Sequence, residues 1–266
     1  KNVEIAYKNI PAVSPVDADR TVGLMRAPGA GKLIALPLII SGLFTASARA
    51  QISDTFQPYV SAGYAYDDNL LRRDNTKNSG AAESDTYTTL VAGVGMERPI
   101  GRQVVTASVR ASKVAFDKNS QLDYTGKDAA AEWQWQLGNH LNGHAGASYS
   151  ESLASFADFG SSERNIRTDT KRYVDGNWRF HPSWQVHAGY VNERFGFDLP
   201  SQSYTTRTEK AAETGFDYIA SSGSTFGMVA RKLKGEYPNQ GVNPVTGVSI
   251  DNGYDQDELK VNVHWL

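Results

Sequence analysis

The sequence contains no cysteine in its 266 residues. It therefore has no disulfide framework and no thiolate metal site. Its charges nearly balance, with 27 Lys and Arg against 29 Asp and Glu, so nothing indicates nucleic acid as a partner. Over residues 51–266 no apolar run reaches the roughly 18 residues of a membrane-spanning helix. None of these absences excludes an exported protein, because a large β-protein folds without disulfides.

One apolar segment lies near the N-terminus, within residues 25–50. It begins with two basic residues, continues as an apolar run over 33–44, and ends in the small-residue pattern Ala48-Arg49-Ala50. This order predicts a secretory signal peptide that is removed before Gln51. A membrane anchor is the alternative, but the run is short for a span. Residues 1–24 are expected to be an unstructured leader or upstream extension.

The rest of the sequence alternates between apolar and polar residues. The stretch "AEWQWQL" (131–137) is an example, with two tryptophans opposite a glutamate and two glutamines. Alternation predicts strands, because successive side chains in a strand point to opposite faces. About ten such segments are expected, each long enough for a tilted crossing of a bilayer, which takes about 9–11 residues. Their predicted spans are 57–67, 86–98, 103–116, 127–137, 142–154, 168–180, 184–196, 207–219, 225–236 and 256–266.

The predicted connections alternate between short and long. The short ones are turn-rich, as at Gly138-Asn139-His140, and the long ones are rich in Asp, Asn, Ser, Gly and Pro. Outer-membrane barrels have this asymmetry, with short periplasmic turns and longer outer loops. The sequence therefore predicts an all-β fold: an antiparallel transmembrane β-barrel of the bacterial outer membrane, over residues 51–266.

In such a barrel the tryptophans of 131–137 would face lipid, and the glutamines would face a wet lumen. Lys113 and Lys210 fall on the apolar face, but near the long-loop ends, where a lipid-facing lysine costs little. Aromatic residues at the strand ends are expected to form interfacial girdles. They are Trp178, Phe180 and Trp184 near a short turn, and Tyr66 and Tyr87 near a long loop.

The lumen-facing side chains are the functional candidates. Six are predicted to line a substrate path: Glu132, Gln134, Gln136, Asp175, Arg179 and Glu213. The wider set adds Glu97, Arg110, His144, Asn177, His187, Asp217, Arg231, Lys260 and His264. An open pore and a plugged interior are both consistent with this pattern, because a narrow barrel fills its interior with paired polar groups.

Signals for catalysis and metal binding are weak, so the sequence predicts no enzyme, no cofactor and no metal site. His144 and Ser148 share a strand face, but four residues separate them by about 13 Å, beyond direct contact. His140 and His144 have no carboxylate-rich partner pattern for zinc. Asp67-Asp68-Asn69 offers oxygen ligands for calcium, and an Asx turn is the favoured reading.

The stretch "PYVSAGYAYDDNLLRR" (58–73) resembles the opening strand of the exopolysaccharide-linked β-barrel porin family of the EpsL type. "RKLKGEYPN" (231–239) resembles the same family more weakly. The resemblance implies a role in moving exopolysaccharide across the outer membrane. The partners it implies are the polymer, outer-membrane lipid and periplasmic export components. It implies no catalytic residues.

Other functions stay open at this stage. A general porin, a structural or adhesin-like barrel acting through its long loops, and a barrel enzyme would share the same strand pattern. A soluble secreted β-sandwich is the fourth alternative, although its strands would be shorter.

Overall fold

The computed structural model describes residues 34–36, 55–73, 83–156, 162–239, 241–242 and 246–265. The predicted leader over 1–24 lies outside the described residues. So does the predicted signal peptide, except for β1 (Ile34–Leu36), a short strand that pairs antiparallel with residues 64–66.

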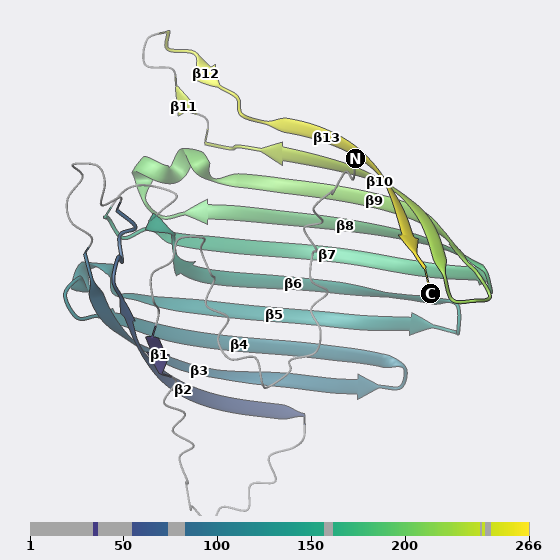
Figure 1. The fold of residues 1–266 in the computed structure, drawn as a ribbon, viewed down its shortest axis with the longest axis horizontal. Helices are drawn as coiled ribbons and strands as arrows, with labels where there is room; N and C mark the ends of the chain where they lie inside the picture. Colours follow the sequence, from purple (N-terminus) through teal and green to yellow (C-terminus); the bar gives the residue numbers. More distant parts are fainter. Residues whose placement is uncertain are drawn as a thin grey trace, which may run out of the picture. The chain divides into compact units, whose positions relative to one another are not determined.

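Ten long strands make up most of the described chain (Figure 1). They confirm the predicted all-β class, and each predicted span falls on one of them. Their bounds are β2 (Phe56–Asp67), β3 (Asp85–Ile100), β4 (Gln103–Phe116), β5 (Tyr124–Leu137), β6 (Leu141–Leu153), β7 (Ile166–His181), β8 (Trp184–Phe197), β9 (Arg207–Ile219), β10 (Thr225–Glu236) and β13 (Tyr254–His264).

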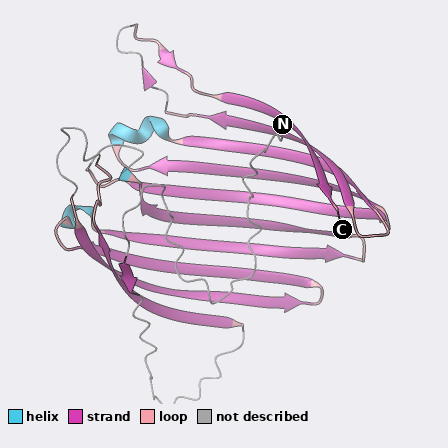
Figure 2. Cartoon of the chain, in the orientation of Figure 1, coloured by secondary structure: helices cyan, strands magenta, loops and turns pink. Residues whose placement is uncertain are grey.

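The strands form a single antiparallel sheet in chain order, β1-β2-β3-β4-β5-β6-β7-β8-β9-β10-β13. Within the described residues no pairing joins β13 back to β1 or β2, so the sheet is open. A separate hairpin pairs β11 (Gly241–Val242) with β12 (Ser249–Ile250). Two 3-10 segments, η1 (Ser120–Leu122) and η2 (Pro200–Thr205), lie in the long connections (Figure 2).

The connections are sorted as the sequence predicts. Tight turns join β3 to β4, β5 to β6, β7 to β8 and β9 to β10, at one end of the sheet. The long connections lie at the other end (Figure 1). Gly101 and Gly138 occupy two of the turns with φ of +63° and +62°, a conformation that costs glycine little.

The register divides the side chains into two faces, because directly paired residues point to the same side. We call the face that carries Ala131 the apolar face, and the face that carries Ala130 the polar face. On the apolar face large hydrophobic side chains are open: Val109 is 54%, Trp133 49% and Leu259 70% exposed. The polar Glu132, by contrast, is 9% exposed. A soluble sheet would have the opposite distribution.

Aromatic rings of the apolar face cluster beside the short turns. Trp184 on β8 stacks against Phe216 on β9, with centroids 4.8 Å apart, and Trp178 contacts Phe180 at 5.6 Å. The rings therefore cluster at the short-turn end, where the sequence predicts an interfacial girdle. The prediction for Tyr87 is wrong: it pairs directly with Phe116 across β3 and β4 and packs on the polar face.

The principal hydrophobic cluster of the described residues lies at the long-connection end. Residues of the connections after β2, β4 and β6 pack there against the ends of the strands. The cluster comprises Leu70, Leu71, Val114, Phe116, Leu122 and Phe156, with Tyr87, Tyr124 and Leu153 beside it. It fixes parts of three long connections against the sheet.

Among the described residues, no helix has the length and apolar character of a membrane span.

Candidate functional site

A row of polar residues crosses the polar face from β5 to β13. Each is paired directly with its neighbour on the next strand. The row reads Gln134, His144, Asp175, Gly189, Glu213, Arg231 and Glu258. Three of the six predicted lining residues, from strands distant in sequence, therefore lie in one line.

Two histidine–aspartate pairs bridge neighbouring strands on this face. His144 Nδ1 lies 3.0 Å from Asp175 Oδ1, and His187 Nδ1 lies 3.0 Å from Asp217 Oδ2. Gln185 also donates to Asp217, at 3.0 Å. Each carboxylate orients the imidazole that it contacts. A histidine–aspartate pair contains no nucleophile of its own, so these two contacts do not by themselves indicate covalent catalysis.

Glu132 is the most enclosed of the predicted lining residues. Its carboxylate accepts hydrogen bonds from the phenol of Tyr173 and, at 3.0 Å, from the amide of Gln134. Tyr173 lies two strands away, so the bond spans β6. Glu132 and Gln134 therefore act as one hydrogen-bonded unit.

Several charges on the polar face are paired, either across neighbouring strands or, for Glu258 and Lys260, along one strand. Arg110 contacts Asp128 at 2.9 Å, and Glu258 contacts Lys260 at 2.7 Å and Arg231 at 3.7 Å. Carboxylates nevertheless outnumber cations in the paired strands of this face. The acidic residues are Asp67, Asp85, Glu97, Asp128, Glu132, Asp169, Asp175, Glu193, Glu209, Glu213, Asp217 and Glu258. The basic residues are Arg110, Arg167, Lys171, Arg207, Arg231 and Lys260.

The structure places five of the six predicted lining residues on the polar face; Gln136 is the fifth, opposite Asn142. Arg179 lies apart, beside the turn between β7 and β8. There its guanidinium donates to the carbonyl of Pro182, at 2.6 Å from Nη2. The sheet register is irregular between Trp178 and His181, which removes Arg179 from the regular alternation.

Tyrosines are the functional side chains that the sequence reasoning missed. Tyr173 donates to Glu132, and Tyr254 donates to Glu209 at 2.8 Å. Both tyrosines occupy strand positions that alternate in phase with the polar residues. That alternation in the sequence could have predicted them as members of the polar face. The two tyrosines add aromatic rings to the polar face, on which the other predicted candidates are charged groups, imidazoles and amides.

Asp67 closes a turn at the end of β2. Its Oδ1 accepts the backbone N–H of Asn69 at 3.0 Å, which is the predicted Asx turn. Both carboxylate oxygens also accept from Arg72, at 2.7 Å, and this hydrogen bonding raises the pKa of Arg72. Across the described residues no group of three or more metal-ligating side chains is assembled.

Comparisons with known proteins show only a distant likeness. No family model matches the sequence, and no curated protein matches it. Among solved structures, the outer membrane channel DcaP of Acinetobacter baumannii is 13% identical, with a TM-score of 0.46 over 77% of this chain. The copper transporter OprC is 9% identical, with a TM-score of 0.38 over 77% of this chain. The match spans 61% of the DcaP chain and 37% of the OprC chain.

Proposed function

We propose that this chain is a β-barrel protein of the bacterial outer membrane. Three features of the fold support the location. The strands run 11–16 residues, long enough for a tilted crossing. One face exposes large hydrophobic side chains along its strands, where a water-facing sheet would be polar. The connections are short at one end and long at the other.

We further propose that the polar face lines a path for polar solutes. The observation that carries this proposal is the cross-strand row from Gln134 to Glu258, which sets an amide, an imidazole, three carboxylates and a guanidinium across the sheet, with Gly189 between Asp175 and Glu213. A water-filled path needs such groups, because they replace the hydrogen bonds a solute makes with water. The surplus of carboxylates favours neutral or cationic solutes over anionic ones.

Exopolysaccharide is the solute that we propose, and this step depends on the sequence resemblance of residues 58–73. Sugar hydroxyls suit a face of amides, carboxylates and tyrosines, which offer many exchangeable hydrogen bonds. A general porin for small polar solutes fits the same polar face equally well. The export role and the general porin role predict different locations for the polysaccharide when the gene is removed.

The experiment measures polysaccharide in a strain lacking this gene. Polymer trapped in the periplasm, with surface polymer lost, supports the export role. Normal surface polymer overturns it and leaves the general porin. In the complemented strain, Gln134→Trp and Gln136→Trp should reduce export while the protein still assembles, and Trp133→Phe on the opposite face is the matched control.

A further inference from the structure

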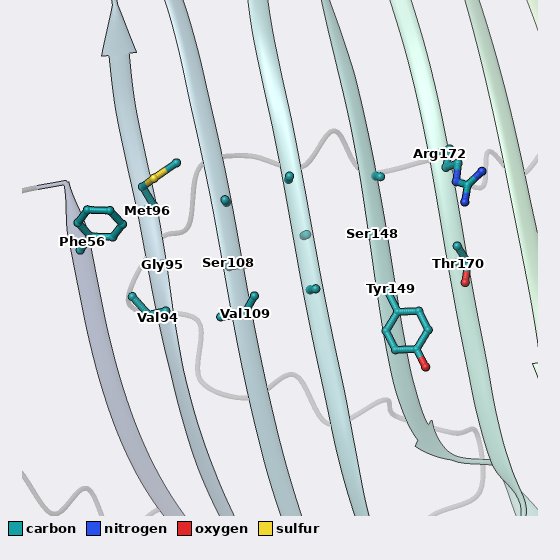
Figure 3. Close-up of a pocket in the computed structure, with 15 residues that line it drawn as sticks. Phe56, Val94, Gly95, Met96, Ser108, Val109, Ser148, Tyr149, Thr170 and Arg172 are labelled. Carbon is teal, nitrogen blue, oxygen red and sulfur yellow. The ribbon is translucent and has the colours of Figure 1, made fainter.

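A hollow of about 550 Å³ lies on the apolar face across strands β2 to β7 (Figure 3). Its floor includes Ala131 and Ala147, which are paired directly between β5 and β6. On the β7 side the hollow ends at Arg172, the direct register partner of Ala147. Figure 3 shows Phe56 and Met96 across the hollow from Arg172. A floor of small residues with a charged border is a shape that a ridge of side chains from another surface could fill.

Arg172 is a charge without a partner on this surface. It lies in the middle of β7, in the same cross-strand row as Ala147 and Ala131. Its side chain is exposed, and within the described residues it forms no ion pair. The nearest carboxylate on its face is Glu151, four residues along β6 from Ala147 and about 13 Å away. That carboxylate already accepts a hydrogen bond from Tyr149.

The depth of Arg172 makes this lack of a partner costly in the proposed membrane location. A basic side chain that faces lipid near the middle of the bilayer costs about 2–4 kcal/mol. A lipid headgroup does not reach that depth. A carboxylate supplied by another protein surface would offset the cost, because a guanidinium forms paired, charge-assisted hydrogen bonds with a carboxylate.

Such a surface exists on the same chain, at β13. Asp255 and Asp257 belong to the apolar face there, and the Asp257 side chain is 80% exposed. Its contact with Lys232, at 3.7 Å, joins two exposed side chains, and pairs of this kind contribute little. Three exposed apolar side chains follow toward the short-turn end, namely Leu259, Val261 and Val263. The apolar face of β13 is therefore a hydrophobic ridge that ends in carboxylates.

The ridge on β13 and the β7 border of the hollow have matching patterns. Both strands run from a long connection toward the short-turn end. On the apolar face, β7 changes from charged to apolar between Arg172 and Val174, and β13 changes between Asp257 and Leu259. In a cyclic assembly all copies cross the membrane in the same direction. A β13 ridge set against the β7 of a neighbouring copy therefore brings opposite charges together and apolar side chains together.

We propose that the β6–β7 border of the hollow is a contact with a second copy of this chain, whose β13 ridge fills it. The partner's Asp257 pairs with Arg172, and the partner's Leu259 and the partner's Val261 lie over Ala147 and Val174. The contact joins two different patches of the chain, as in cyclic assemblies. Two hollows set against each other would instead oppose like charges. This inference rests on the proposed membrane location, but not on any transported solute.

The chain has no cysteine, so introduced cysteines report the contact directly. Ala147→Cys and Val261→Cys are combined in the full-length protein, which is produced in the bacterial outer membrane and oxidised there. Within one copy the two positions are five strand spacings apart, about 24 Å. The Cα atoms of a disulfide lie within about 7 Å of each other, so a disulfide between the two positions joins two copies.

We expect at least about fivefold more covalent dimer from this variant than from the matched control, Ala147→Cys with Val60→Cys. Val60 is on the same face and is 70% exposed, so the control measures random collisions. Mass spectrometry of the dimer identifies the joined positions. In the first variant, Arg172→Asp or Asp257→Arg alone should lower the yield about fivefold, and the two together should restore it, because the pair is rebuilt with exchanged charges.

Three results would overturn the assignment. One is a dimer yield no greater than that of the control, which leaves the hollow to lipid. Another is a disulfide that joins position 147 of both copies, which would indicate two hollows facing each other. The third is a yield that the charge reversals do not change. Protease protection of the membrane fraction is measured separately. A protein that does not insert refutes the membrane location and the contact with it, while an inserted protein without the disulfide refutes the contact alone.

Discussion

The phenol of Tyr173 on β7 reaches over Gly146 on β6 to donate a hydrogen bond to the carboxylate of Glu132 on β5. Gly146 is the direct register partner of both residues. A Cβ at this glycine would collide with the phenol ring of Tyr173. The absence of a side chain on β6 is what allows the two residues to meet.

Gly146→Ala should therefore displace Tyr173 and break its bond to Glu132. We expect a loss of about 1–3 kcal/mol in the free energy of unfolding, as for overpacking in a filled site. Urea unfolding in lipid vesicles, followed by tryptophan fluorescence, measures it. The control is Gly63→Ala on the polar face of β2, where nothing lies within 4 Å of an added Cβ. Equal effects of the two substitutions would contradict the arrangement.

Asp85 should hold the connection after β4 in place. Its carboxylate is fully buried and accepts backbone N–H groups of Thr86, Lys118 and Asn119 at 2.7, 3.0 and 2.9 Å. Asp85→Ala leaves these donors without their acceptor, at about 1–3 kcal/mol for each one that stays buried. Trypsin should then cleave after Lys118 about tenfold faster in the assembled protein, since local opening becomes easier.

The neighbouring Asp117→Ala provides the control for that experiment, because the Asp117 side chain is exposed. Its cleavage rate should stay close to that of the wild type. Unchanged cleavage in Asp85→Ala would show that other contacts hold the connection.

The carboxylate surplus of the polar face should make the path selective for cations. Glu213 lies between Gly189 and Arg231 in the polar row, and Glu213→Lys reverses one charge there. In planar bilayers with a KCl gradient, the reversal potential should move toward that of chloride, with the permeability ratio changed about twofold or more. Lys113→Glu, on the apolar face, should leave the ratio unchanged. A wild type that prefers chloride would contradict the charge assignment.

The strands were predictable because the period of two persists over long segments. The predicted span 103–116 coincides with β4, and 207–219 coincides with β9. The same parity placed Gln134, Asp175 and Glu213 on one face. The alternation could not predict the register between strands. The register determines that Gln134 lies opposite His144 and that Asp175 lies next to His144 on the following strand.

The sequence-based errors have physical causes. Arg179 was predicted from strict alternation, but the register shifts between Trp178 and His181, and its guanidinium caps the turn carbonyl instead. Tyr87 was placed in a girdle because it is aromatic and near a strand end. Its partner Phe116 draws it into the cluster under the long connections, and long-range packing of this kind has no local signal.

The central claim is that the apolar face is the surface that contacts lipid. Substitutions at two adjacent alanines test this claim. Ala130 and Ala131 lie in the middle of β5, are both exposed, and point to opposite faces. Ala131→Arg should lower the free energy of unfolding in vesicles by about 2–4 kcal/mol, because arginine would enter the bilayer midplane. Ala130→Arg, facing the polar side, should change it by less than about 0.5 kcal/mol. Equal costs, or a greater cost at Ala130, would contradict the assignment of the apolar face to lipid.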